Sequence, residues 1–338
     1  MTAVPVRPTY ESTLGGLARD NDRIVVLTAE NRAVIRRLPE QLGPRFIDVG
    51  ICEQTMIGMA AGLALRGRVP IVHALATFLT LRAFEFIRTD VGIAGLPVKL
   101  IGGVAGLLSE ANGPTHQALD DLALMRTIPG MAIVCPADED DLCAALPCIV
   151  ESSGPVYVRH NPRATTRAHE PFVFGRAERM RTGGQVTILA LGLLVAESME
   201  AAAMLGEDGI SVGVISVRTL FPIDEAAVLA AARNAHLLVT VEDHFLVGGL
   251  YQTVSEILFR HGLSGTQVLP IGFDARFFAP GLLPDVLRYE GLTGSGLAER
   301  IAEAWDRRRA GQGAAIAPSP NNPPRPPGPR LLGGLSLV

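Results

Sequence analysis

Apolar residues in the first half of the chain form short runs rich in Val and Ile, separated by longer amphipathic or Ala-rich segments. Buried parallel strands give this pattern, because helices cover both faces of their sheet. We expect strands at 23–28, 46–49, 69–73, 98–101, 132–135 and 156–159, and helices at 33–42, 53–65, 79–91, 118–127 and 138–152. Residues 1–165 are therefore predicted to form an α/β domain with a mostly parallel sheet.

The alternation resumes after a turn-rich join at 161–175 and a polar stretch, RAERMRTGG. Here the expected strands are 186–190, 212–216, 237–241 and 267–270, and the expected helices are 198–205, 224–234, 249–261 and 295–309. Residues 166–309 thus form a second, smaller domain, again with a mostly parallel sheet flanked by helices. From residue 310 onward Pro and Gly dominate and no period persists, so we predict a disordered tail over 310–338.

The composition narrows the function classes. Of the 338 residues, 48% are hydrophobic and 19% charged, and the formal net charge is -4, which excludes wholesale disorder and argues against a nucleic-acid-binding surface. The four cysteines form no CxxC pair, so no zinc site, redox motif or disulfide framework is indicated. The N-terminus does not resemble a signal peptide, and the apolar runs 55–65 and 186–196 are shorter than the roughly 20 residues that span a bilayer. We expect a cytoplasmic protein with no membrane partner.

Several common nucleotide and hydrolase motifs are missing. The chain contains no GxGxxG after a strand, no GxxxxGK[ST], no HExxH and no GxSxG. An α/β protein of this size without its own phosphate loop either binds no nucleotide or borrows the phosphate site from another chain.

Glu53 is the first candidate for chemistry. It stands in DVGICEQ, where an expected strand ends and an apolar helix begins. Ligands bind at strand ends of open α/β sheets, and burial raises the pKa of a carboxyl group, so such a group can hold or donate a proton at neutral pH. The alternative is a structural carboxylate that satisfies free N–H groups at a helix N-terminus.

Two further segments offer candidates. Phe78, Leu81 and Phe84 recur every three residues and form either an apolar wall against a flat ring or an ordinary core stripe. His116 lies in the Gly- and Pro-broken loop SEANGPTHQ, where an imidazole suits proton transfer near neutral pH. A loop histidine without a role is the alternative.

Polar residues also follow two later strands. Arg159 lies just past a strand end and either clamps a phosphate or carboxylate or forms a surface ion pair. Glu242, Asp243 and His244 occupy successive positions and should point in different directions. We therefore assign these three a structural or interface role rather than a metal site.

Taken together, these segments resemble the C-terminal half of the transketolases over residues 7–305. GICEQ, TF(x)5F, GPTHQ and GPVYVR are similar to the pyrimidine-binding domain, and VEDH(x)3GGL is similar to the C-terminal domain. Deoxyxylulose-phosphate synthases and the beta subunits of 2-oxoacid dehydrogenases share the architecture. The resemblance implies a thiamine-diphosphate-binding fold for the first domain and a transketolase C-terminal domain for the second.

The resemblance also implies a role for each candidate residue. Glu53 would hydrogen-bond the aminopyrimidine ring of thiamine diphosphate, and Phe78 would stack on that ring, with Leu81 and Phe84 completing the apolar pocket. His116 would serve as a proton shuttle at the substrate. The substrate-binding positions that it implies are Arg7, Asn112, His116 and Arg159.

Three positions depart from the family pattern. Asn112 stands where the family usually has Asp, Val104 falls where it has a phosphate-contacting His, and a phosphate-contacting Ser falls near Val34. Losing a charge-assisted donor at a phosphate site costs about 1.5–3 kcal/mol per bond. A less phosphorylated substrate, or a carrier-bound thiol as acceptor, therefore stays open.

The diphosphate-binding part of a transketolase is absent from this sequence, because no GDG occurs in it. A hydrated Mg²⁺ or Ca²⁺ with phosphate oxygens then needs carboxylate and carbonyl ligands from another polypeptide. We expect no metal ligand in this chain and an obligate complex with a diphosphate-domain subunit, with two copies of each.

Three hypotheses follow. In the first, the chain is the pyrimidine-binding subunit of a split transketolase-like transferase that moves a two-carbon ketol unit from a ketose or ketose phosphate to an aldose. In the second, the same unit goes to a lipoyl or acyl-carrier thiol, as in dehydrogenase complexes. In the third, the chain is a non-catalytic paralogue, against which the joint presence of Glu53, Phe78 and His116 argues.

Overall fold

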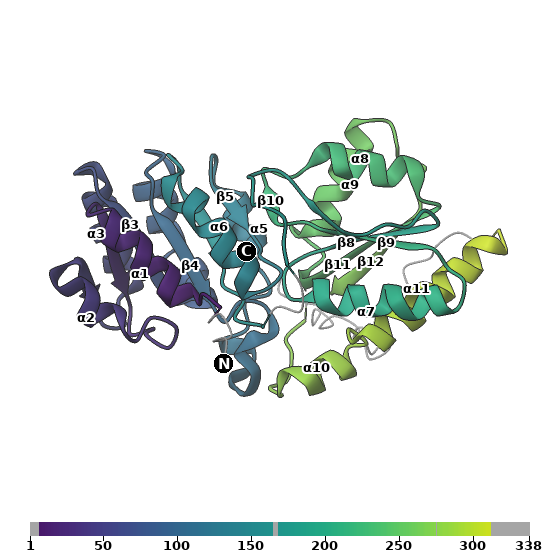
Figure 1. Cartoon of the computed structure of the whole chain (residues 1–338), viewed down its shortest axis with the longest axis horizontal. Helices are drawn as coiled ribbons and strands as arrows, with labels where there is room; N and C mark the ends of the chain where they lie inside the picture. The colour runs from purple at the N-terminus through teal and green to yellow at the C-terminus, as the bar shows by residue number, and fades with distance from the viewer. Residues whose placement is uncertain (1–6, 165–167, 275, 312–338) are drawn as a thin grey trace, which may run out of the picture.

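The computed structural model describes residues 7–164, 168–274 and 276–311. It contains two sheets, each flanked by helices, which lie next to each other along the longest axis of the molecule (Figure 1). The predicted α/β class and the mostly parallel sheets are confirmed. Among the described residues, no helix combines the length and the apolar character that crossing a membrane requires.

The first sheet has seven strands in the order β10-β5-β6-β4-β3-β1-β2. All neighbouring pairs are parallel except β10 with β5, which is antiparallel. The strands are β1 Ile24–Thr28, β2 Phe46–Asp48, β3 Val69–Leu75, β4 Lys99–Gly103, β5 Ala132–Val134, β6 Val156–Arg159 and β10 Thr219–Phe221. The chain thus returns from its second half to complete the first sheet.

Side chains that alternate along β1 divide the core of this domain between two faces. Val25 and Leu27 pack on the side of α3 Glu53–Leu65 and α5 Asp121–Arg126, whereas Ile24 and Val26 pack on the opposite side. The opposite side is covered by α1 Tyr10–Asp20, α2 Leu38–Leu42 and α6 Glu139–Glu151. The remaining elements are η1 Gly43–Arg45, η2 Phe78–Arg82, α4 Phe84–Phe86, η3 Ile87–Gly92 and η4 Leu107–Thr115.

The second sheet has five strands in the order β12-β11-β8-β9-β7, with only β7 antiparallel to its neighbour. Helices α7 and α11 cover one face, and α8 and α9 cover the other (Figure 1). The strands are β7 Glu178–Arg181, β8 Val186–Ala190, β9 Val212–Ser216, β11 Leu237–Phe245 and β12 Val268–Phe273. The helices are α7 Leu194–Glu207, α8 Glu225–Asn234, α9 Leu250–Arg260, α10 Leu283–Tyr289 and α11 Gly294–Arg309.

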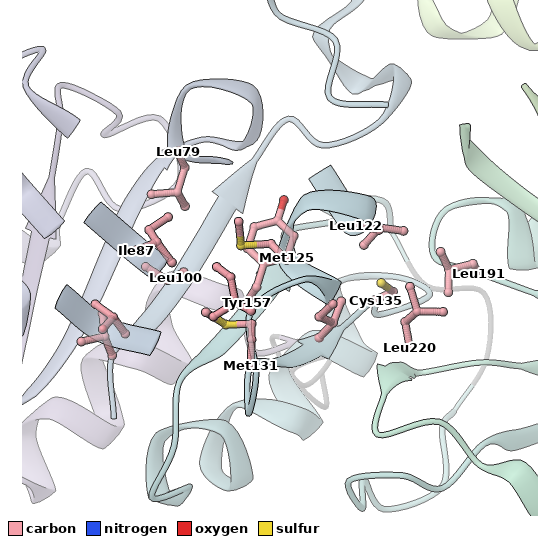
Figure 2. Close-up of a cluster of buried hydrophobic side chains, with 14 of the residues drawn as sticks. Leu79, Ile87, Leu100, Leu122, Met125, Met131, Cys135, Tyr157, Leu191 and Leu220 are labelled. Carbon is pink, nitrogen blue, oxygen red and sulfur yellow. The ribbon is translucent and has the colours of Figure 1, made fainter. Parts of the chain in front are cut away.

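One hydrophobic cluster runs through both domains. It begins under α3, continues through Leu100 and Tyr157 of the first sheet, and reaches Leu191 and Leu220 beside the second (Figure 2). Cys135 and Leu122 lie where the two parts meet. The shared core fixes the orientation of the second sheet against the site-bearing first sheet.

Two predicted helices differ from the structure. Only the end of the 33–42 segment is helical, because Pro39 occupies the first turn of α2, where its fixed φ and missing N–H are tolerated. The 79–91 segment is helical but mostly π-helical, in the order η2, α4, η3. The extra residue per turn breaks the three-residue spacing of Phe78, Leu81 and Phe84.

Besides the short segments η1 and η4, the elements α1, β7, β10 and α10 were not expected. Of the two strands, β7 is the mostly polar ERMR and β10 is the three-residue TLF, and neither forms an apolar run. The predicted tail at 310–338 begins just after α11, and its residues 312–338 lie outside the described residues.

Candidate functional site

The order of strands reverses at β1, which pairs with β2 on one side and β3 on the other. In open parallel sheets, ligands bind beyond the carboxyl ends of the strands at such a switch point. The segments that follow β2, β3 and β4 carry Glu53, Phe78 and His116, respectively. The topology therefore brings three of the sequence-predicted residues to one edge of the sheet.

Backbone strain is concentrated at the same edge. Glu30 follows β1 and Val104 follows β4, and both have positive φ, 56° and 55°. Glu110, in the loop before His116, has φ of 45°. Left-handed backbone is unfavourable for side chains with a Cβ, most of all for a β-branched residue such as Val104. Such strain tends to persist at binding sites that surrounding structure holds in place.

Glu53 is the first residue of α3 and is 2% exposed. One nitrogen of Arg82, Nη1, donates to both carboxylate oxygens, at 2.9 Å to Oε1 and 2.7 Å to Oε2. The Arg82 side chain is 37% exposed, so the ion pair joins a buried carboxylate to a partner that reaches the surface. A buried carboxylate needs such a partner, because its desolvation is otherwise uncompensated.

Phe78 lies on the other side of this guanidinium. The Cζ atom of Arg82 is 4.3 Å from the centroid of the Phe78 ring, a cation–π contact. The ring of Phe78 in turn meets the His116 imidazole edge to face, with centroids 5.0 Å apart. Glu53, Arg82, Phe78 and His116 thus form a continuous row, which we call the Glu53 row.

Arg82 was not among the residues expected from the sequence. A signal was present, since Arg82 follows Phe78 by four residues, a spacing that places two side chains on the same side of a helix. The three-residue repeat of apolar residues drew attention to Leu81 and Phe84 instead.

Leu81 and Phe84 are surrounded by other residues than those of the Glu53 row. Leu81 is 50% exposed and borders a hollow of about 80 Å³ that is also lined by Phe245 and Arg276 of the second domain. Phe84 is half-buried and packs against the hydrophobic cluster under α3. Leu81 thus faces the contact between the domains, and Phe84 supports the site from the core.

The loop that carries His116 packs closely against the second domain. A Cβ on Gly113, where φ is +69°, would lie 3.3 Å from Pro280 of the second domain, so only glycine fits this approach. Nδ1 of His116 lies 2.8 Å from the Thr115 hydroxyl, which leaves Nε2 of the imidazole for another partner. Asn112 is exposed on this loop.

Arg159, a substrate-binding position implied by the resemblance, lies in a buried network of ion pairs. It is buried, and its guanidinium donates to Asp121 at 2.9 Å, to Asp243 at 2.7 Å and to the carbonyl of Ala118 at 3.0 Å. Since these acceptors engage all three of its nitrogens, Arg159 ties the two domains together. The alternative of a surface ion pair is wrong, because the ion pair is buried.

Arg7 lies near the start of α6, where it pairs with Asp140 at 3.8 Å. Its side chain is 66% exposed. Arg7 takes part in none of the contacts of the Glu53 row described above.

Glu242 and His244 are buried and hydrogen-bonded to the backbone, which agrees with the structural role expected for them. The Glu242 carboxylate accepts the backbone amides of Leu250 and Tyr251 at the start of α9, at 2.6 and 2.8 Å. Burial raises its pKa to about 8 despite those hydrogen bonds. Nε2 of His244 accepts the amide of Ala123 at 3.4 Å, across the domain contact.

A second cluster contains metal-ligating residue types. Ligand atoms of Asp141, His169 and Glu178 lie within 4.8 Å of one another. Nε of Arg218 already donates to Asp141 at 2.7 Å and lies 3.9 Å from Glu178. A fixed guanidinium thus supplies the positive charge that a metal would bring, so the group is an ion-pair cluster between the domains.

The chain matches two protein families in succession. Residues 2–167 match "Transketolase, pyrimidine binding domain", and residues 175–297 match "Transketolase, C-terminal domain". It is 37% identical over 308 residues to the 6-deoxy-6-sulfo-D-fructose transketolase subunit SqwH of Clostridium sp. (strain MSTE9), covering 90% of this chain and 95% of that one.

Two further comparisons bear on the length of the chain. It is 37% identical to the 1-deoxy-D-xylulose-5-phosphate synthase of Gloeobacter violaceus, covering 89% of this chain but 49% of that protein. A solved structure titled "Split gene transketolase, inactive beta4 tetramer" is 34% identical, with a TM-score of 0.78, and the match covers 88% of this chain and 97% of that one.

Proposed function

Because this chain belongs to the transketolase family, whose pyrimidine-binding and C-terminal domains it contains, we propose that it is the pyrimidine-binding subunit of a split transferase. The enzyme would use thiamine diphosphate to move a two-carbon ketol unit from a ketose to an acceptor. The single observation that carries the proposal is the position of Glu53, a buried carboxylate at the switch point of the sheet that shares one flat partner, the Arg82 guanidinium, with the Phe78 ring.

The residues present fit an aminopyrimidine ring. The guanidinium of Arg82 is a flat cation that donates N–H to Glu53 while it lies over Phe78. A flat heterocycle with N–H groups on its edge needs the same two contacts, a carboxylate in its plane and an apolar face beneath it. Glu53 and Phe78 would therefore hold the ring of the cofactor.

Each side chain has a definite task in this proposal. Glu53 would keep a proton shared between its carboxylate and the ring edge, in a pocket that excludes water. Phe78 would fix the plane of the ring, and His116 would move a proton at its free Nε2 to and from an oxygen of the substrate. Thiamine diphosphate, when bound, supplies the electron sink that a ketose needs for carbon–carbon bond cleavage.

The diphosphate and its Mg²⁺ or Ca²⁺ would be held mainly by a partner subunit with the diphosphate domain. Three facts support this: the chain has no GDG sequence, it spans about half of the synthase relative, and the split-transketolase neighbour is described as inactive when it is a β4 tetramer. We propose two copies of each chain in the active enzyme.

Apolar side chains around α3 offer a surface for this assembly. Ile51 precedes α3, Leu65 ends it and Ile93 follows η3, and these side chains are 65, 70 and 76% exposed. Large exposed apolar side chains that lie together are typical of interfaces. Because Ile51 lies two residues before Glu53, a subunit bound there would also cover the ring site.

The choice of donor follows from the relatives. The SqwH subunit is named for a 6-deoxy-6-sulfo ketose, and the Arg159 guanidinium of this chain donates to two buried aspartates. We propose a ketose donor whose anionic end is read mainly by other residues, of which Arg7 is the exposed candidate on this chain.

The proposal is tested with the chain copurified with its diphosphate-domain partner. Thiamine diphosphate and Mg²⁺ are added, and 6-deoxy-6-sulfofructose and ketose phosphates are screened as donors against aldose and lipoyl acceptors by mass spectrometry. We expect ketol transfer to an aldose and a fall in rate on the order of 10²–10⁴ for Glu53→Gln.

Glu85→Gln is the matched control, because Glu85 is an exposed glutamate on α4 nearby. Transfer to the lipoyl acceptor alone would support the second hypothesis over the first. Full activity of Glu53→Gln would mean that this carboxylate has no part in the chemistry, and it would overturn the proposal.

A further inference from the structure

Arg82 occupies the place that the proposed function gives to the cofactor ring. We infer that Arg82 is a positioning residue that stands in for the aminopyrimidine ring in the cofactor-free chain and moves away when the ring binds. The inference rests on the proposed function, because it takes Glu53 and Phe78 as the seat of the ring.

Both contacts of the ring seat are filled by one side chain. Nη1 of Arg82 reaches the two oxygens of Glu53 at 2.9 and 2.7 Å, and its Cζ lies 4.3 Å from the centre of Phe78. Since the guanidinium contacts both the carboxylate and the aromatic ring, a second flat group cannot make the same two contacts without displacing it. Ring binding and the Arg82–Glu53 ion pair are therefore mutually exclusive.

The exchange leaves each group with a partner. In the cofactor-free chain, Arg82 keeps the buried carboxylate compensated and oriented, as a buried charge requires. On binding, Glu53 would take up one proton from solvent in place of the departing guanidinium and share it in a hydrogen bond with the ring edge, and Phe78 would offer its face to the ring. The guanidinium returns to water, where a free arginine is well solvated.

The position of Arg82 in the fold permits this movement. It is the last residue of the π-helical segment η2, and Ala83 after it departs from helical geometry with φ of -106° and ψ of 14°. Its side chain is 37% exposed, whereas that of Glu53 is 2% exposed. Arg82 can thus swing outward by rotamer changes alone, while Glu53 and the rest of the row stay in place.

The contrast with Arg159 shows that the exposed placement is particular to Arg82. Arg159 is held from all three of its nitrogens by two buried aspartates and a backbone carbonyl. Arg82 is held through one nitrogen and one ring. The Arg159 side chain is therefore fixed in place, whereas the Arg82 side chain can exchange its partners.

The test uses the full chain and, as probe, the aminopyrimidine alcohol that corresponds to the ring half of thiamine. Binding is followed by saturation-transfer NMR and titration calorimetry for wild type, Arg82→Met and Arg82→Lys. We expect Arg82→Met to bind the probe about three- to tenfold more tightly, because the internal competitor and its cation–π contact are gone. Arg82→Lys, which keeps the charge but not the flat guanidinium, should lie between the two.

Arg88→Met is the matched control, since Arg88 is an exposed arginine further along the same helical segment. Its affinity should equal that of wild type. Equal or weaker binding by Arg82→Met would overturn the inference, because Arg82 would then be a lasting partner of the ring. If Arg82→Met does not fold, Arg82→Lys takes its place in the test. Binding of the probe by Arg82→Lys no tighter than by wild type would then overturn the inference.

Glu53→Gln separates the failure of this inference from the failure of the proposed function. If probe binding to wild type depends on Glu53 but does not tighten in Arg82→Met and Arg82→Lys, the stand-in role is wrong and the ring seat stands. If the probe binds no variant, or if Glu53→Gln leaves its affinity unchanged, the ring seat itself is wrong and both proposals fail.

Discussion

Phe78 has two aromatic-type contacts at once, with the guanidinium of Arg82 on one side and the imidazole of His116 on the other. The side chain therefore links the carboxylate that would hold the cofactor to the imidazole that would face the substrate. A change at Phe78 should act on cofactor affinity first, because the ring face is what a bound heterocycle would touch.

We expect Phe78→Leu to weaken thiamine diphosphate binding to the assembled enzyme by about 0.5–1.5 kcal/mol, or roughly two- to tenfold. Leucine keeps the apolar volume but lacks the aromatic face. The dissociation constant is measured by calorimetry, with Phe86→Leu, a partly exposed phenylalanine on α4, as control. An unchanged constant would remove Phe78 from the ring seat.

At this scale, sequence reasoning found residues whose evidence is local. The burial of Glu53 at the start of a helix could be predicted because a strand, a carboxylate and an apolar helix follow one another directly. The contact of Arg82 could not, because one of its nitrogens donates to both oxygens of a residue 29 positions earlier. Arg159 shows the same limit, since its partner Asp243 is 84 positions away.

Among the elements, the segments after β4 carry the most demanding geometry. Gly106 has φ of +60°, and a Cβ there would lie 1.8 Å from Oδ2 of Asp243 and 2.7 Å from its Cγ. The loop from Gly106 to His116 is thus pressed against β11, the strand that carries Asp243. Glycine is required both for the turn and for the close approach.

Gly106→Ala should destabilise the fold by more than the roughly 1–2 kcal/mol of left-handed strain alone, because the new methyl group also pushes Asp243 away from Arg159. Gly95→Ala is the matched control, as Gly95 has φ of +61° and a Cβ added there would meet no atom within 4 Å. Urea denaturation measures both. Equal losses for the two variants would contradict the role assigned to the Gly106 contact.

Most regular elements could be predicted from the sequence, and their exceptions have physical causes. α3 agrees with its predicted range because it is a long apolar run, and β6 does so because a short apolar run is bounded by turn residues on both sides. The π-helical segments η2 and η3 could not be anticipated, because an apolar pattern does not distinguish one extra residue per turn. The strand β10 was hidden because its pairing partner lies in the other domain.

Across the part of the molecule that the structure describes, buried ion pairs join the domains at two places. One is the Arg159 contact with Asp121 and Asp243, and the other is the cluster around His169. His169 lies between Asp138 at the start of α6 and Glu178 of β7, at 2.9 and 2.8 Å. Burial alone lowers the pKa of His169, but hydrogen bonds to the two carboxylates outweigh it and raise the pKa to about 10.

This shift gives a pH dependence with a definite sign. A pKa raised above the unfolded value of 6.5 contributes stability that is complete below pH 6.5 and is lost as the pH rises through about 10. We expect His169→Gln to be less stable than wild type near pH 6 and to approach wild type near pH 10. Urea midpoints across this range provide the measurement.

His261→Gln is the control, because His261 is exposed and pairs only with a surface glutamate in the contacts described. It should follow the wild-type profile. A constant difference between wild type and His169→Gln over the whole range would show that the imidazole is not a cation in the folded protein.

The strand β10 has a practical consequence for anyone who dissects this protein. A fragment cut in the join between the halves would keep Glu53, Phe78 and His116 but would strip β5 of the neighbour that pairs with its outer side. Bare strand borders invite self-association. The domain that carries Glu53 can therefore be isolated without self-association only if residues 219–221 are added to it or if charged residues are introduced at the exposed edge of β5.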